Sequence, residues 1–148
     1  MQSNVIDDVV LPSPSHIGAI VKDISATTKF LSSICGIGPW ETFVDSVSED
    51  KLIVGRPFKL KAAVAKLGSI ELELLQPLEG KSLWSDFLTT RGEGIHHICF
   101  VIPNWDEIVP KLQESGARMV AGAVSRNMRW CYLEIKPGGI IVEFEELL

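Results

Sequence analysis

One pattern occurs twice in this chain of 148 residues, and it constrains the fold more than any other feature. In each half a histidine opens an apolar strand, and a glutamate lies in a later strand. His16 begins HIGAIVKD and Glu73 lies in SIELELLQP, whereas His97 begins HICFVIPN and Glu143 lies in GIIVEFEEL. The histidines are 81 residues apart and the glutamates 70, which indicates an internal duplication. We therefore expect two similar modules that form a cleft between them.

The first half has the pattern β-α-β-β-β. Residues 15–22 alternate as a strand, Asp23 occupies an N-cap position, and Gly36 ends the helix that follows. The remaining strands of this half are expected at residues 39–46, 57–67 and 69–76.

The same order recurs after a linker helix at about 82–90, which Ser82 can cap. A strand at 95–102 leads to a helix that Asn104 caps and Gly116 ends. Pro110 inside this helix predicts a kink or an early stop. The last strands are expected near residues 118–121, 128–135 and 139–145.

The composition predicts one globular domain over residues 1–148, because 46% of the residues are hydrophobic and 22% are charged. No apolar run approaches the roughly 20 residues that cross a bilayer, and no secretory signal opens the chain, so we expect a cytoplasmic protein. A net charge of -5 and a pI near 5.2 argue against a nucleic-acid partner. The cysteines have no CxxC spacing, and we expect three buried thiols at Cys35, Cys99 and Cys131.

Two imidazoles and two carboxylates suit a divalent ion such as Zn, Co, Ni, Mn or Fe, with one or two coordination positions left for a substrate. Strand period leaves alternatives open within this set. Glu71 shares a face with Glu73, and Glu145 shares one with Glu143. His96 and His97 are expected on opposite faces, so that only one of them is a ligand.

Four segments are similar to a known family: HIGAIVKDI, ELELLQPLEGKS, GEGIHHICFVI and GGIIVEFEE. With them the chain resembles the vicinal oxygen chelate superfamily (glyoxalase, bleomycin resistance, dioxygenase), and within it the methylmalonyl-CoA epimerases. The resemblance covers residues 15–147. It implies an α+β fold in which two βαβββ modules, at about 15–78 and 93–147, form a curved mixed sheet around a metal-binding cleft. Residues 1–13 would form an N-terminal arm.

By position, the resemblance implies that one divalent metal ion (Co, Zn, Ni or Mn) is held by His16, Glu73, His97 and Glu143. Glu143 is then the expected catalytic base. Relatives supply a second carboxylate from the third strand of the first module, but PFKLKAAVAKLG contains no acid here. Lys61 is the expected second acid–base group, and the alternative is that Lys59 and Lys61 are two solvated strand lysines.

The implied activity is a metal-dependent epimerase or isomerase that removes the proton next to a thioester carbonyl to give a metal-stabilised enediolate. The alternatives are a glyoxalase I-like lactoylglutathione lyase and a non-catalytic small-molecule-binding protein of the resistance type. The expected partner is an acyl-CoA, in a homodimeric protein with no nucleic-acid or membrane partner. Two further expectations come from side-chain type. Trp130 would form a cavity wall, and the CoA phosphates would meet Arg56, Lys59, Lys61, Arg126 and Arg129.

Overall fold

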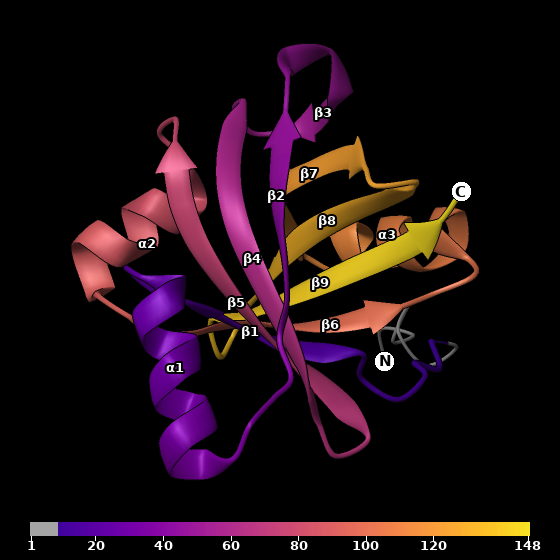
Figure 1. Cartoon of the computed structure of the whole chain (residues 1–148). Coiled ribbons are helices and arrows are strands. Elements are labelled where there is room, and N and C mark those ends of the chain that lie inside the picture. The colour runs from indigo at the N-terminus through magenta and orange to yellow at the C-terminus, as the bar shows by residue number, and fades with distance from the viewer. Residues whose placement is uncertain (1–8) are drawn as a thin grey trace.

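A computed structural model describes residues 9–148 of the chain. The first eight residues of the expected N-terminal arm lie outside the described residues. Nine strands form one sheet in the order β2-β4-β5-β1-β6-β9-β8-β7-β3, and the sheet curves strongly (Figure 1). The expected α+β fold with a curved mixed sheet is confirmed, since both parallel and antiparallel neighbours occur.

Apart from the short strand β3, which only the first half contains, the helix and strands of the two halves follow the same order. The first half consists of β1 (His16–Ile20), α1 (Ile24–Cys35), β2 (Glu41–Val47), β3 (Leu52–Val54), β4 (Phe58–Leu67) and β5 (Ile70–Glu79). Helix α2 (Leu83–Arg91) leads to the second half, which consists of β6 (Gly94–Val101), α3 (Trp105–Glu114), β7 (Arg118–Ser125), β8 (Met128–Ile135) and β9 (Ile140–Leu147). In each half the first strand is parallel to the last, and β1 joins the halves by pairing antiparallel with β6.

Local signals set the ends of the first two helices as predicted. The side chain of Asp23 accepts a hydrogen bond from the Ala26 N–H at 3.1 Å, and Gly36 ends α1 in the left-handed conformation at φ 68°. The hydroxyl of Ser82 accepts a hydrogen bond from the Ser85 N–H at 3.2 Å and so caps α2.

The sequence predicted two features of helix α3: a cap at Asn104, and a kink or an early stop at Pro110. Asn104 occupies the N-cap position, but its side chain makes no capping hydrogen bond. Instead the Trp105 N–H donates to a carboxylate oxygen of Glu146 in β9, at 2.8 Å. The helix continues through Pro110 to Glu114, so the early stop expected at this proline is wrong.

Strand β3 has no counterpart in the predicted elements. It contains three residues, which is too short for strand alternation to be recognised, and it forms because it pairs with β7 of the other half. Strands β2 and β3 are the two edges of the sheet, which curves until it is nearly closed.

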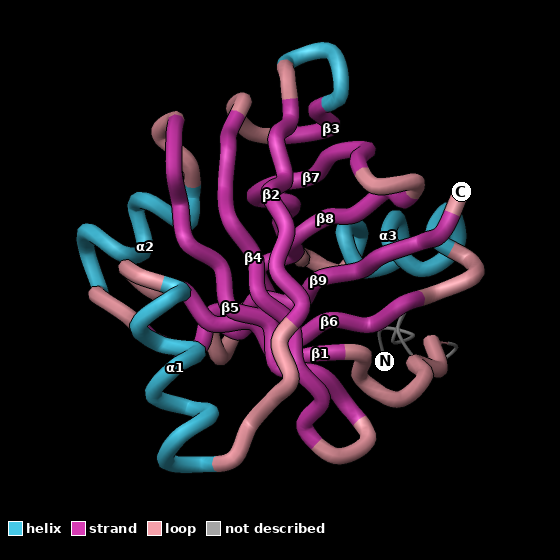
Figure 2. Tube along the Cα trace, viewed as in Figure 1, coloured by secondary structure: helices cyan, strands magenta, loops and turns pink. Residues whose placement is uncertain are grey.

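The strands form the middle of the molecule, and the helices lie around them (Figure 2). Alternation along the strands divides the buried residues between the two faces of the sheet. On the outer face, Leu74 packs in the cluster that contains Ile24 of α1, and Phe144 packs in the cluster that contains Trp105 of α3. The inner face encloses an aromatic cluster with Phe58, Trp84, Trp130 and Tyr132. The candidate site lies on this inner face.

Two cysteines follow the prediction and one does not. Cys99 and Cys131 are buried free thiols, whereas Cys35 in the last turn of α1 is exposed, because this part of the helix faces away from the sheet. Within residues 9–148, no helix combines the length and the apolar character needed to cross a membrane.

Candidate metal centre

Four adjacent strands in the middle of the sheet each contribute one of the four predicted ligands. His16 lies on β1, Glu73 on β5, His97 on β6 and Glu143 on β9. One ligand atom from each residue lies within 4.8 Å of all the others, and all four side chains are buried. Each half therefore supplies one imidazole and one carboxylate to a single cluster.

The spacing of these atoms fits a single metal ion. Nε2 of His16 lies 3.1 Å from Oε2 of Glu143 and 3.4 Å from Oε1 of Glu73. Nε2 of His97 lies 3.0 Å and 3.6 Å from the same two oxygens, and 3.4 Å from Nε2 of His16. Ligands about 2.1 Å from one ion would lie about 3.0 Å apart in an octahedral site and about 3.4 Å apart in a tetrahedral one. The donor set and its spacing thus suit a divalent cation.

The charges of the cluster also support a metal site. Burial would raise the carboxyl pKa of Glu73, but hydrogen bonds to His16 and His97 outweigh it and hold this pKa well below its usual range. Burial would also raise the pKa of Glu143, and the charge of His97 and the hydrogen bond to His16 lower it. The site therefore holds two ionised carboxylates away from water, which is costly unless a positive charge lies between them.

The two imidazoles supply that charge when no metal is bound. Burial alone would lower the pKa of His16, but hydrogen bonds to Glu143 and Glu73 raise it to about 11. Burial would also lower the pKa of His97, but the charge of Glu143 and hydrogen bonds to Glu143 and Glu73 together raise it to about 9. A metal ion would replace these two protons, because imidazole binds metals in its neutral form.

Gly18 of β1 allows His97 to reach the cluster. The two residues lie opposite each other in the β1–β6 ladder, and a Cβ at Gly18 would overlap the imidazole ring of His97. The glycine in HIGAIVKD is therefore needed for the close approach of this ring to the backbone of β1.

A β-bulge at His96 overturns the expectation that His96 and His97 lie on opposite faces. Gly18 pairs with His97 while the next residue of β1 pairs with Ile95, so His96 is an extra residue in β6. Both imidazoles contact the ring of Tyr132, and their Nδ1 atoms lie 3.1 Å apart. This hydrogen bond orients His97 so that its Nε2 faces the carboxylates.

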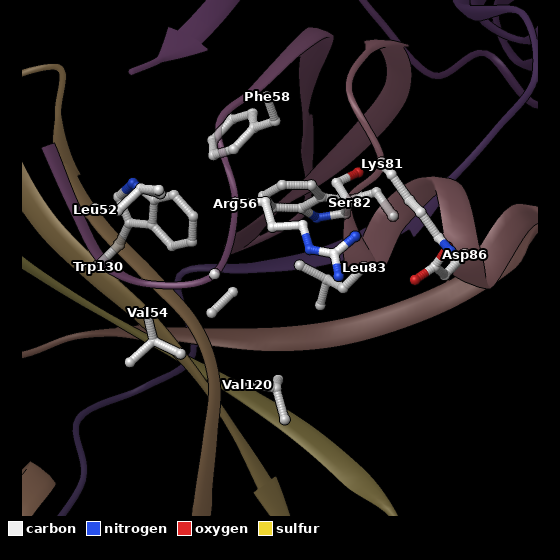
Figure 3. A pocket seen from close by; sticks show the side chains of 13 residues that line it. Leu52, Val54, Arg56, Phe58, Lys81, Ser82, Leu83, Asp86, Val120 and Trp130 are labelled. Atoms are coloured by element: carbon white, nitrogen blue, oxygen red, sulfur yellow. The ribbon is translucent and has the colours of Figure 1, made fainter. Parts of the chain in front are cut away.

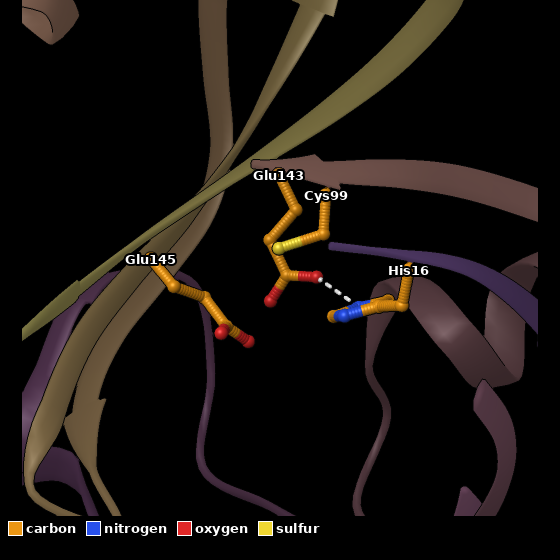
Figure 4. Close-up of side chains that lie close together, drawn as sticks. All are labelled: His16, Cys99, Glu143 and Glu145. Carbon is orange, nitrogen blue, oxygen red and sulfur yellow. Dashed lines mark hydrogen bonds and ion pairs between the residues drawn. The ribbon is translucent and has the colours of Figure 1, made fainter. Parts of the chain in front are cut away.

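The sequence did not decide which glutamate of each pair, Glu71 or Glu73 and Glu143 or Glu145, lies at the site. The structure decides the first pair. Glu71 is partly exposed and lies 4.0 Å from Lys66, whereas Glu73 lies in the cluster. Glu145 is also buried, and together with Cys99 it forms a second group around His16 and Glu143 (Figure 4). Burial and the charge of Glu143 raise the pKa of Glu145 to about 7. Burial keeps Cys99 a thiol by raising its pKa far above the usual range.

An inner cavity adjoins the cluster, and it shares the aromatic side chains of Phe58, Trp84 and Trp130 with an outer cavity. The inner cavity has a volume of about 20 Å³ and reaches Glu73 and Glu143. The outer cavity has a volume of about 280 Å³ and lies between β3, β7 and the start of α2 (Figure 3). The prediction that Trp130 forms a cavity wall is confirmed.

The structure does not bring Lys61 to this site. Its neighbours in β4, Leu60 and Ala62, line the inner cavity, so Lys61 lies on the other face of the sheet. Lys59 lies on that same face, with its ammonium group 3.8 Å from Glu79. The alternation of FKLKAAVAKL in the sequence already indicated that both lysines lie on the face opposite Leu60 and Ala62.

The basic residues expected to meet phosphates do not line one common cavity. Arg56 lines the outer cavity and Arg126 lines the inner one. Arg129 is occupied by Glu146 and Asp106. Tyr132 is a site residue that the sequence reasoning missed, although MRWCYLEI places it on the same strand face as Trp130.

Known proteins share this fold and parts of this sequence. The family described as the Glyoxalase/Bleomycin resistance protein/Dioxygenase superfamily matches residues 15–132. The uncharacterized protein YqjC of Bacillus subtilis (strain 168) is 29% identical over 105 residues, which is 71% of this chain and 68% of that protein. The mitochondrial methylmalonyl-CoA epimerase of Bos taurus is 24% identical over 143 residues, which is 89% of this chain and 73% of that protein.

A solved structure agrees with these relatives. Methylmalonyl-CoA epimerase in complex with methylmalonyl-CoA and NH4+ matches with a TM-score of 0.72 and 25% identity, over 93% of this chain and 96% of that one. The family resemblance in the sequence is confirmed.

Proposed function

Because the chain belongs to the glyoxalase/bleomycin resistance protein/dioxygenase superfamily, we propose that it is a metal-dependent epimerase or isomerase acting next to a thioester carbonyl. One observation carries this proposal: two imidazoles and two ionised carboxylates converge in a buried site with the spacing of metal ligands. The similarity to methylmalonyl-CoA epimerases supports the choice of reaction within the superfamily.

His16, Glu73, His97 and Glu143 would hold the metal ion. When bound, a divalent ion supplies a Lewis acid that stabilises the negative charge developing on a substrate carbonyl oxygen. The aromatic wall of Phe58, Trp84 and Trp130 excludes water from the side of the site that faces the outer cavity. Low water content strengthens every electrostatic interaction in the site.

Glu143 is the proposed catalytic base. Its carboxylate is buried, and its lowered pKa keeps it ionised at neutral pH, ready to take the proton from the carbon next to the carbonyl. An epimerase also returns a proton to the opposite face of that carbon. Lys61 is not positioned for this step, and Glu145 is the additional carboxyl that the structure places beside Glu143.

The proposed substrate is an acyl-CoA. A relative bound to methylmalonyl-CoA supports this class, and so does the outer cavity, which is large enough for part of an extended thioester chain. The inner cavity has room for only one or two water molecules, so the side chains that line it would have to move to admit an acyl group. The homodimer expected from the resemblance stays a prediction, which sedimentation velocity can test.

Solvent isotope exchange tests the reaction directly. Metal-loaded protein in deuterium oxide should place deuterium at C2 of methylmalonyl-CoA, whereas His97→Ala and Glu143→Ala should bind no metal and give no exchange. Glu79→Ala is the matched control, because this carboxylate is 75% exposed and remote from the cluster. Metal-loaded wild type that gives no exchange would overturn the proposal, and turnover of the glutathione–methylglyoxal adduct in its place would identify a lyase.

A further inference from the structure

Arg126 is the one basic side chain among the described residues that line the inner cavity. The other charged residues of that lining are acidic: Asp45, Glu73 and Glu143. The charges of Glu73 and Glu143 are balanced by the two histidines or by a metal ion. Arg126 stands apart from them at the solvent end of the cavity, where its side chain is 36% exposed.

The contacts of Arg126 hold its guanidinium in place but leave some of its N–H donors free. Nε lies 3.5 Å from Oδ2 of Asp45, and Cζ lies 4.6 Å from the ring centroid of Phe43. The hydroxyl of Ser125 donates to Asp45 at 3.2 Å and accepts from the Trp130 ring N–H at 3.0 Å, which fixes the carboxylate. A guanidinium has five N–H donors, and those on its two Nη atoms have no hydrogen-bond partner among residues 9–148.

The backbone at Arg126 is unfavourable for an arginine. Arg126 and Asn127 form the two-residue turn between β7 and β8, with φ values of 53° and 59°. Glycine, asparagine and aspartate are favoured in turns of this kind, since other residues have their Cβ too close to the backbone. A strained conformation of this sort is retained where the side chain is needed in that place.

We propose that Arg126 binds an anionic group of the thioester substrate at the mouth of the inner cavity and thereby selects acidic substrates. This role rests on the proposed function and names the substrate class for the same site. The free Nη donors match the geometry of a carboxylate or a phosphate, which a planar guanidinium binds through two parallel hydrogen bonds. The anionic group is therefore either a carboxylate on the acyl part or a phosphate on the carrier.

Three thioesters separate these two sources. Methylmalonyl-CoA carries both anionic groups, isobutyryl-CoA replaces the carboxylate by a methyl group, and the methylmalonyl thioester of N-acetylcysteamine has no phosphate. Dissociation constants of metal-loaded wild type, Arg126→Gln, Arg126→Gly and Arg118→Gln are measured by calorimetry. Arg118 is the matched control, because it is 71% exposed and pairs with Glu134 away from the cavities.

If the carboxylate is the bound group, both Arg126 variants should bind the two methylmalonyl thioesters about 10- to 100-fold more weakly and isobutyryl-CoA unchanged. If a phosphate is bound, the two CoA thioesters should weaken and the N-acetylcysteamine thioester should not. Equal affinities of wild type and both Arg126 variants for all three thioesters would overturn the role of Arg126. A wild type that binds none of them would instead overturn the proposed function.

Thermal unfolding excludes a purely structural role. Glycine suits a φ of 53° better than arginine does, so Arg126→Gly should unfold within about 5 °C of wild type even though it loses the contacts to Asp45 and Phe43. A large fall in the unfolding temperature with unchanged relative affinities would show that Arg126 only ties the turn to β2.

Discussion

The close approach of His97 to the backbone of β1 depends on a single missing side chain, at Gly18. Gly18→Ala should displace the imidazole and weaken metal binding by about 10- to 100-fold, the loss that follows when a ligand is no longer correctly oriented. Titration of the metal-free protein with the metal alone measures this affinity.

Gly94→Ala is the control for this substitution. Gly94 also lies in the β1–β6 ladder, but a Cβ there meets no atom within 4 Å. Equal metal affinities of Gly18→Ala and wild type would show that His97 is not a ligand.

At the residue scale, the sequence predicted which side chains meet but not how they are oriented. The repeat predicted that each half contributes one imidazole and one carboxylate, because a repeat places like residues at like positions of the fold. The resemblance to the family then selected His16, Glu73, His97 and Glu143, which the structure brings together. The orientation of His96 was not predictable, since it depends on a bulge that exists only in the pairing of β6 with β1.

Helix α3 shows how a distant residue replaces a missing local cap. Glu146 of β9 accepts hydrogen bonds from the Trp105 N–H at 2.8 Å and from Nε and Nη2 of Arg129 at 2.9 and 2.6 Å. Arg129 in turn lies over the ring of Trp105, 4.8 Å from its centroid. Glu146→Gln should lower the free energy of unfolding by about 2 kcal/mol, because charge-assisted hydrogen bonds at a partly buried position are lost.

Urea unfolding measures this difference, with Glu134→Gln as the comparison. Glu134 also pairs with two basic residues, Arg118 and Lys136, but both are more than 70% exposed. Such surface pairs contribute little, so this variant should unfold like wild type. If Glu146→Gln also unfolded like wild type, Glu146 would not anchor α3.

The elements that the sequence predicted well are those defined by their own residues. The caps of α1 and α2 follow from Asp23 and Ser82, whose hydrogen-bond partners lie three residues away. Strand β3 and the start of α3 depend on β7 and β9, which are far away in the sequence. Local patterns carry no information about such partners.

At the scale of the whole molecule, the cluster connects the two halves of the sheet. Two of its residues belong to the first half and two to the second, so a metal ion bound there would stabilise both halves together. Free metal at 100 times its dissociation constant should raise the free energy of unfolding by about 2.7 kcal/mol.

Denaturant unfolding in the presence of metal and of a chelator measures this effect. Tryptophan fluorescence and circular dichroism should report the same midpoint, as expected for one cooperative unit. Glu143→Gln should unfold alike in both conditions. A wild-type midpoint that does not respond to metal would contradict the site.

The distance along the chain between the ligands also determines when the site can form. His16 and Glu143 lie 127 residues apart in sequence, yet their side chains meet at 3.1 Å. A protein emerges from the ribosome from its N-terminus, and contacts between distant residues form late in folding. The chain must therefore be synthesised at least as far as Glu143 before the fourth ligand exists. A metal ion would bind only after all four ligands are present, and the ions available in the cell at that moment would decide which one the site holds.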